Sequence, residues 1–212
     1  MDNDEIIWGA TLFVGLLISL TIHEWAHAFT AWKLGDDTAA SQGRLTFNPL
    51  AHADPMGTLL LPALMIFSGA NFLFGWAKPV PVDPTRFRRG VNMHRGMLIT
   101  SLAGPASNLV LAVLIFLLLR VAAKYQLMPD NYFDPIKVAG FLNVLLVVFN
   151  LLPVPPLDGH RMLPSSVQEA LRPYSMLLFI GLLALIWTSG GLVNRVVLSI
   201  SRAIYQFFVW LI

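Results

Sequence analysis

The sequence contains no cysteine and carries little charge. None of its 212 residues is Cys, and 12% are charged, against about 25% in soluble domains. The lack of cysteine excludes disulfides and thiolate metal ligands. With 56% hydrophobic residues, the composition excludes an ordinary soluble domain. The net charge is only +2 and no basic tract is present, so we expect no nucleic-acid partner.

Charge is missing from several long apolar runs. The uncharged runs are Met97–Leu119, Val138–Leu157 and Ser175–Asn194. A fourth run, from Ile6 to Trp32, contains Glu24 as its one formal charge. Runs of roughly 18 or more apolar residues are candidates for crossing a bilayer. The pattern therefore predicts an integral membrane protein built from helices.

Two histidines and a glutamate interrupt the first apolar run as His-Glu-Trp-Ala-His, residues 23–27. On a helix, positions i and i+4 share a face, so His23 and His27 can bind one Zn²⁺. Glu24 lies beside them, placed to take a proton from a metal-bound water. Ionisable residues within a spanning segment are rare and usually functional. The alternative is a polar face packed on a neighbouring helix, or side chains that reach the membrane surface.

A second polar feature lies at residues 150–162, NLLPVPPLDGHRM. Its three prolines break the preceding helix before Asp158. Broken backbone at membrane depth is tolerated where it is buried in protein or lines a wet cavity. The pattern thus predicts that Asp158 is delivered to such a cavity, with Gly159 permitting close backbone approach. An Asp-Gly turn outside the membrane is the alternative.

These motifs resemble the site-2 protease family of intramembrane zinc metalloproteases. The matching segments are HEWAHAFTAWKLGD, GRLTFNPLAHADPMGT, FGWAKPVPVDPTRF, AGPASNL and NLLPVPPLDGHRM. They follow the order of the compact prokaryotic branch, which has no PDZ domain, and cover most of residues 19–162. The resemblance implies one membrane-embedded metalloprotease domain over residues 1–212. Its catalytic core is expected at about 6–162, with C-terminal helices at 175–212.

The resemblance also implies a role for each site residue. His23, His27 and Asp158 are expected to bind one Zn²⁺ per chain, and Glu24 to be the catalytic base. Asn150 is expected near the substrate or the oxyanion. The implied activity is hydrolysis of peptide bonds in or near transmembrane segments of other proteins, within the lipid bilayer.

The position of Asp158 constrains the topology. If His27 and Asp158 meet at one depth, their helices run in the same direction, so one of the two intervening apolar segments does not cross. Pro55–Ala77 contains proline and glycines that interrupt a helix, and we predict that it is re-entrant. The predicted fold is an all-α polytopic membrane protein with about five transmembrane helices and one re-entrant hydrophobic segment.

Basic residues predict the orientation. The loop Lys78–Arg95 is rich in Lys and Arg, as cytoplasmic loops are. We therefore expect the active site towards the cytoplasmic side of a prokaryotic cell membrane, although Arg120, Lys124 and Lys137 then lie outside, against the rule. Residues 192–212 carry polar side chains at helical spacing, and either cross the membrane or lie at its surface.

Two smaller motifs each have two interpretations. Residues 43–49, GRLTFNP, alternate like a short strand. They predict a short β element near the active site that could pair with an unwound substrate, or a plain surface hairpin. The small residues of AGPASN, 103–108, predict close helix packing. Asn108 in this motif could instead hydrogen-bond a ligand histidine.

The remaining histidines are weaker candidates. His52 and His94 lie in predicted loops and are expected to be solvated. His160 follows Asp158 closely and is either an interfacial base or an alternative ligand.

Two rival functions use the same residue types. A metal transporter would usually need several intramembrane metal sites along a path, whereas the sequence shows one cluster. A non-catalytic scaffold could retain zinc but has no need for Glu24. The sequence therefore favours the protease.

Overall fold

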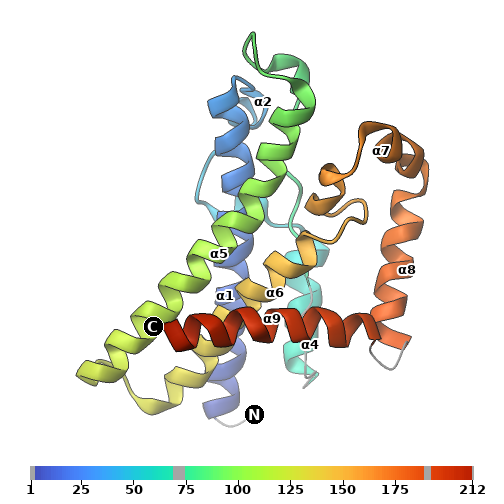
Figure 1. Cartoon of the computed structure of the whole chain (residues 1–212). Helices are drawn as coiled ribbons and strands as arrows, with labels where there is room; N and C mark the ends of the chain where they lie inside the picture. The colour runs from blue at the N-terminus through green and yellow to red at the C-terminus, as the bar shows by residue number, and fades with distance from the viewer. Residues whose placement is uncertain (1–2, 69–74, 189–191, 212) are drawn as a thin grey trace.

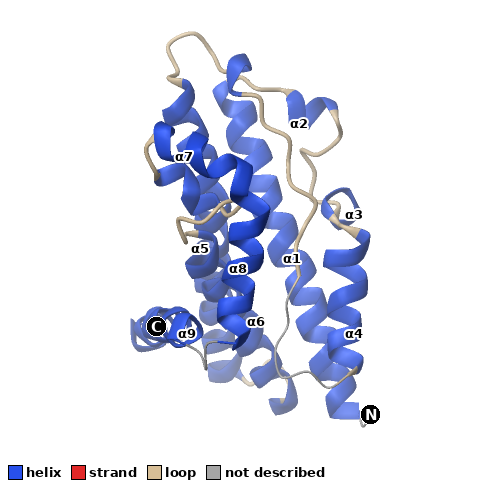
Figure 2. Ribbon diagram, turned by 90° about the vertical axis from the view of Figure 1, so that its right-hand side faces the viewer, coloured by secondary structure: helices blue, strands red, loops and turns tan. Residues whose placement is uncertain are grey.

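The computed structural model describes residues 3–68, 75–188 and 192–211. The α-helices are α1 Asn3–Leu34, α2 Thr38–Ser41, α3 Pro49–His52, α4 Leu61–Phe67, α5 Met93–Tyr125, α6 Phe133–Asn150, α7 Ser165–Leu171, α8 Ser175–Thr188 and α9 Leu192–Leu211. Helices α1, α5 and α6 pack together as the centre of the molecule (Figures 1 and 2). This confirms the expectation of an all-α membrane protein.

In the described part of the chain, three helices are long and apolar enough to cross a membrane. They are Ile7–Leu34, Met93–Tyr125 and Asp130–Asn150. The sequence predicted about five such helices. Helix α8 has only 14 residues, and α9 lies crosswise to the central helices rather than along them (Figure 1).

The central helices alternate in direction. In Figure 1, α1 rises from the N-terminus, α5 descends beside it and α6 rises again. Helices α1 and α6 therefore run the same way, as a site shared by His27 and Asp158 requires.

The segment Pro55–Ala77 starts and ends at neighbouring positions. It begins with a π-helical turn, Pro55–Leu60, which continues into α4. The Trp76 N–H donates to the Gly57 carbonyl at 3.1 Å, and Ala53 and Ala77 form an antiparallel bridge. Its two ends thus lie side by side, as expected of a re-entrant segment; residues 69–74 fall outside the described residues.

The strand predicted at residues 43–49 is wrong. Gly43 has a positive φ of 69°, and the Arg44 N–H donates back to the Ala39 carbonyl at 2.8 Å, closing a turn after α2. The segment then bends into α3 without pairing to another strand. Phe47 is largely exposed and stacks on Trp25 of α1 with ring centroids 4.5 Å apart.

Helix α9 presents three different faces. Val197 and Ser201 are buried against the bundle, and Tyr205 packs its ring on Phe116 of α5. Arg202 lies on an exposed polar face, whereas Ile200 belongs to an exposed apolar one. One protein-facing, one polar and one apolar face suit a helix lying in a membrane surface. This geometry favours the surface-helix interpretation of residues 192–212.

Candidate metal centre

Helix α1 places two imidazoles on one face, one turn apart. His23 and His27 are 6% and 8% exposed, and their Nε2 atoms lie 3.0 Å apart. The helix extends for 32 residues through this motif because apolar residues surround it on both sides. The two rings are therefore held rigidly below the protein surface.

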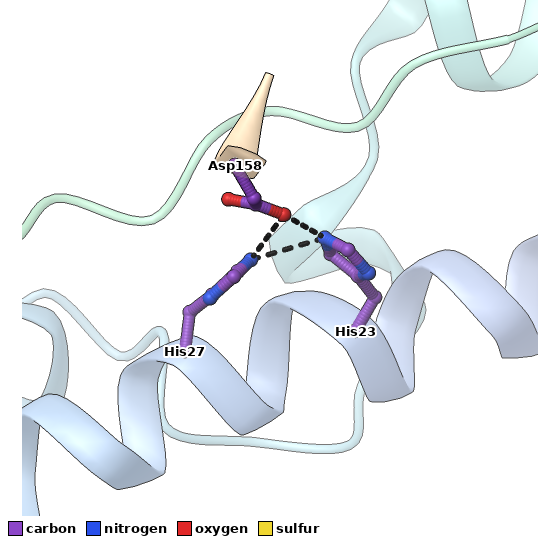
Figure 3. A group of neighbouring side chains, drawn as sticks. All are labelled: His23, His27 and Asp158. Atoms are coloured by element: carbon purple, nitrogen blue, oxygen red, sulfur yellow. Dashed lines mark hydrogen bonds and ion pairs between the residues drawn. The ribbon is translucent and has the colours of Figure 1, made fainter. Parts of the chain in front are cut away.

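Asp158 reaches the same point from the far end of α6. That helix ends at Asn150, and a proline-rich turn leads into a short 3₁₀ helix, Asp158–Met162. A Cβ on Gly159 would collide with the Leu151 carbonyl, so only glycine fits this close backbone approach. The helix break that the three prolines predicted thus aims the Asp158 carboxylate at α1 (Figure 3).

The three side chains fit a zinc ion by distance. Asp158 Oδ2 lies 3.2 Å from His23 Nε2 and 3.4 Å from His27 Nε2. Ligand atoms bound at about 2.0–2.2 Å by tetrahedral zinc lie roughly 3.3–3.5 Å from one another. The observed separations of 3.0–3.4 Å are close to this spacing. Among the described residues, this is the one group of three or more such side chains able to share a metal.

The partners of the opposite ring nitrogens support the same assignment. His23 Nδ1–H donates to Asn108 Oδ1 at 2.6 Å, and His27 Nδ1–H donates to the Thr100 carbonyl at 2.7 Å. Each neutral ring then carries its lone pair on Nε2. Two lone pairs and a carboxylate oxygen face one another with no donor between them, an arrangement that a cation satisfies.

Asn108 belongs to a buried amide network across three helices. Its Nδ2 donates to Asn143 Oδ1 on α6 at 2.9 Å. Asn143 Nδ2 in turn donates to Ser19 Oγ on α1 at 2.9 Å. Asn108 and Asn143 are fully buried. Sequence reasoning named Asn108 and missed Asn143, although a polar residue in an uncharged spanning run was the available signal.

Gly104 of α5 lies against the two histidines. A Cβ there would collide with Nε2 of His27 and come within 2.6 Å of Nε2 of His23. The small residue expected to permit helix packing therefore also leaves room at the two Nε2 atoms.

Glu24 bonds to a different element from the three clustered side chains. Its carboxylate is largely buried, and Oε2 accepts a hydrogen bond from the Val80 N–H at 2.9 Å. Residue 80 lies in the loop that follows the segment Pro55–Ala77. One carboxylate oxygen is thus anchored to the backbone, and Oε1 remains to accept a proton.

Other predicted residues lie outside this group. Asn150 donates its Nδ2–H to the Leu146 carbonyl of its own helix at 3.0 Å. Within the described part of the chain, Asn150 forms no hydrogen bond with the three clustered side chains. His160 Nδ1–H donates to the Leu157 carbonyl at 2.6 Å, so its ring is turned to the local backbone.

The expectation for His52 is wrong. Its ring is 1% exposed, and its Nε2–H donates to the Thr46 carbonyl at 2.8 Å. Burial lowers the pKa of His52 below its ordinary value, which favours a neutral ring. His94, by contrast, is exposed as expected, but it lies in the first turn of α5 rather than in a loop.

Comparison with known proteins identifies the relatives of the chain. Residues 120–188 match Peptidase family M50. The chain is 42% identical over 169 residues to "Putative zinc metalloprotease YwhC" of Bacillus subtilis (strain 168), covering 76% of this chain and 71% of that protein. It is 40% identical over 166 residues to "Putative zinc metalloprotease Rip2" of Mycolicibacterium smegmatis, covering 76% of this chain and 61% of that protein. No solved structure matches the chain significantly.

Proposed function

The chain belongs to peptidase family M50 as a zinc metalloendopeptidase, and we propose that it hydrolyses peptide bonds in or near transmembrane segments of other membrane proteins. The observation that carries this proposal is that Asp158 meets His23 and His27 of α1, a helix long enough to cross a membrane. A hydrolytic site at that depth is placed to act on chains that are themselves in the bilayer. Such cleavage is the chemical step of regulated intramembrane proteolysis.

We assign the zinc ligands to His23, His27 and Asp158. When bound there, zinc supplies Lewis acidity, which lowers the pKa of a coordinated water and polarises the scissile carbonyl. The Nδ1 hydrogen bonds orient the two imidazoles towards the ion. The buried surroundings limit competition from bulk water.

Glu24 is the proposed general base. The Val80 N–H holds Oε2, so Oε1 takes the proton released during attack and passes it to the leaving amine. Asn150, at the end of α6, is the proposed donor to the substrate or the oxyanion. The anchored geometry of Glu24 supports the first role, whereas the second rests on the family resemblance.

The active site is proposed to face the cytoplasmic side. His23 follows Ile7 of the first span by 16 residues, which corresponds to about 24 Å of helix rise. This is most of a bilayer core of roughly 30 Å. The basic loop that begins at Lys78 extends to the C-terminal end of α1, where the Arg88 N–H donates to the Leu34 carbonyl at 2.8 Å. A basic loop at this end of the helix is expected on the cytoplasmic side.

The test is a substitution that separates chemistry from metal binding. In liposomes with a transmembrane substrate, Glu24→Gln should abolish hydrolysis and leave zinc bound. Full hydrolysis by Glu24→Gln would remove the proposed base. Mass spectrometry of membrane proteins that accumulate in cells carrying Glu24→Gln should identify substrates.

A metal transporter or a zinc-containing scaffold is the alternative. A transporter should move zinc across the liposome membrane, and a scaffold should leave substrates intact with either Glu24 or Gln at this position.

A further inference from the structure

The loop residues 78–80 present one backbone donor to Glu24. Pro79 and Pro81 have no N–H, so between Lys78 and Val82 only Val80 can donate. The Lys78 N–H is used by the His52 carbonyl at 2.9 Å. The sequence Lys-Pro-Val-Pro thus leaves a single N–H, and it is the one that holds Glu24 Oε2 at 2.9 Å.

Arg44 fixes this loop from the other side. Its guanidinium donates from Nη2 to the Lys78 carbonyl at 2.5 Å and from Nη1 to the Pro79 carbonyl at 3.4 Å. Two donors from one rigid planar group restrict both position and tilt of the peptide. The next peptide N–H along the chain is that of Val80.

Arg44 is an unusual cation. It is 5% exposed, and within the described residues no carboxylate lies at ion-pair distance from it. Burial of an unpaired charge is expensive. Burial lowers the pKa of Arg44, and the negative charge of Glu24 opposes that lowering. The cation and the carboxylate are therefore linked electrostatically, with the loop between them.

The local fold explains how Arg44 reaches this place. The positive φ of Gly43 reverses the chain after α2, and the Arg44 N–H then bonds to the Ala39 carbonyl. A Cβ at residue 43 would be strained in this conformation. The Gly-Arg pair thus turns the guanidinium inward.

We propose that Arg44 is a positioning residue for the catalytic base: by holding the carbonyls of Lys78 and Pro79, it keeps the Val80 N–H on Glu24 Oε2 and so leaves Oε1 free for proton transfer. This inference rests on the proposed function of Glu24. It predicts that Arg44 affects turnover and leaves substrate binding and zinc content unchanged.

The experiment compares Arg44→Met with Val80→Pro, which deletes the N–H directly. General bases contribute about 10²–10⁴-fold, and mispositioning should remove a large part of that factor. Each variant should lower kcat roughly 10- to 100-fold, with KM and bound zinc unchanged. Arg44→Lys should recover part of the loss. Two control variants should have the kcat of the wild type. Arg89→Met changes an exposed arginine, and Val82→Pro places a proline elsewhere in the same loop.

The double variant provides the decisive comparison. If Arg44 acts through Val80, Arg44→Met combined with Val80→Pro should be no slower than the slower single variant. Independent, multiplying losses would overturn the inference, as would a wild-type kcat in either single variant. If Arg44→Met fails to fold, the test is made with Val80→Pro alone. A wild-type kcat in Val80→Pro would show that the Val80 N–H is not needed to position Glu24, and would overturn the inference. Glu24→Gln is measured in parallel, and activity in that variant would instead refute the proposed function.

Discussion

Asn108 of α5 and His23 of α1 share a hydrogen bond of 2.6 Å between Oδ1 and Nδ1. The bond fixes which nitrogen of His23 carries the hydrogen. It depends in turn on the amide orientation of Asn108, which Asn143 holds by accepting from Nδ2.

Replacing Asn143 by Leu should therefore weaken zinc binding. Without Asn143, only the Ser19 carbonyl, at 3.2 Å, accepts from Asn108 Nδ2, so the amide flips more easily and presents a donor to His23. Loss of such outer partners typically costs 10–100-fold in metal affinity, and we expect a drop of about that size in chelator competition. Ser201→Ala, at a buried hydroxyl bonded within α9, is the control and should bind zinc normally. Unchanged affinity in Asn143→Leu would show that the Ser19 carbonyl is enough to hold the Asn108 amide.

Gly104→Ala should reduce zinc occupancy sharply. The added methyl group would occupy space at the two Nε2 atoms and push the rings apart. Gly181→Ala is a matched control, since a Cβ there meets no atom within 4 Å; alanine should raise helix stability by up to about 1 kcal/mol. Metal analysis of the purified proteins distinguishes the two. Normal zinc content in Gly104→Ala would show that the rings do not occupy the observed positions when metal is bound.

Purified protein should contain about one zinc ion per chain, and Asp158→Ala should lower that content. The reason is the loss of one of three ligands in a site of catalytic type. Asp134→Ala, which removes an exposed carboxylate paired with Lys137, should retain zinc. Full retention in Asp158→Ala would instead assign the third ligand to another residue.

Single introduced cysteines should map the topology cleanly, because the chain has none of its own. Arg89→Cys lies in the loop before α5, and Leu127→Cys lies just after it. An impermeant thiol reagent should label Arg89→Cys from the cytoplasmic side and Leu127→Cys from the outside. Labelling of both positions from one side would contradict the crossing by α5.

Substrates should carry helix-breaking residues near the cleaved bond. A transmembrane helix satisfies its own carbonyls, so cleavage needs local unwinding. Gly and Pro lower helix stability by roughly 1 and 3 kcal/mol relative to Ala. Replacing them with Leu should slow cleavage in liposomes without preventing membrane insertion. Equal rates for both substrates would argue against unwinding as a requirement.

Local patterns predicted the parts of the site that depend on short-range geometry. The four-residue spacing of His23 and His27 defines a helix face, and three prolines define where α6 ends. The common direction of α1 and α6 followed from the need for Asp158 to meet these histidines. Helical spacing, helix termination by proline and the direction of successive crossings do not depend on how the rest of the chain packs.

The parts that escaped prediction depend on partners distant in sequence. The role of Asn143 is visible only when the fold places Asn108 opposite it. The role of Arg44 is visible only when the fold places residues 78–80 next to its guanidinium. The alternation of Leu45 and Phe47 misled the prediction of a strand. Phe47 is 60% exposed and stacks on Trp25 of α1, so apolar alternation over a few residues does not establish strand pairing.

The chain order of the three clustered residues also determines when each of them is made during translation. His27 and Asp158 are 131 residues apart (158 − 27). At roughly 5–20 residues per second, the ribosome needs on the order of ten seconds between them. Throughout that interval α1 has its two imidazoles, but Asp158 has not yet been made. The proposed zinc site is therefore completed only after α6 has been made, and we expect a chain interrupted before residue 158 to be inactive.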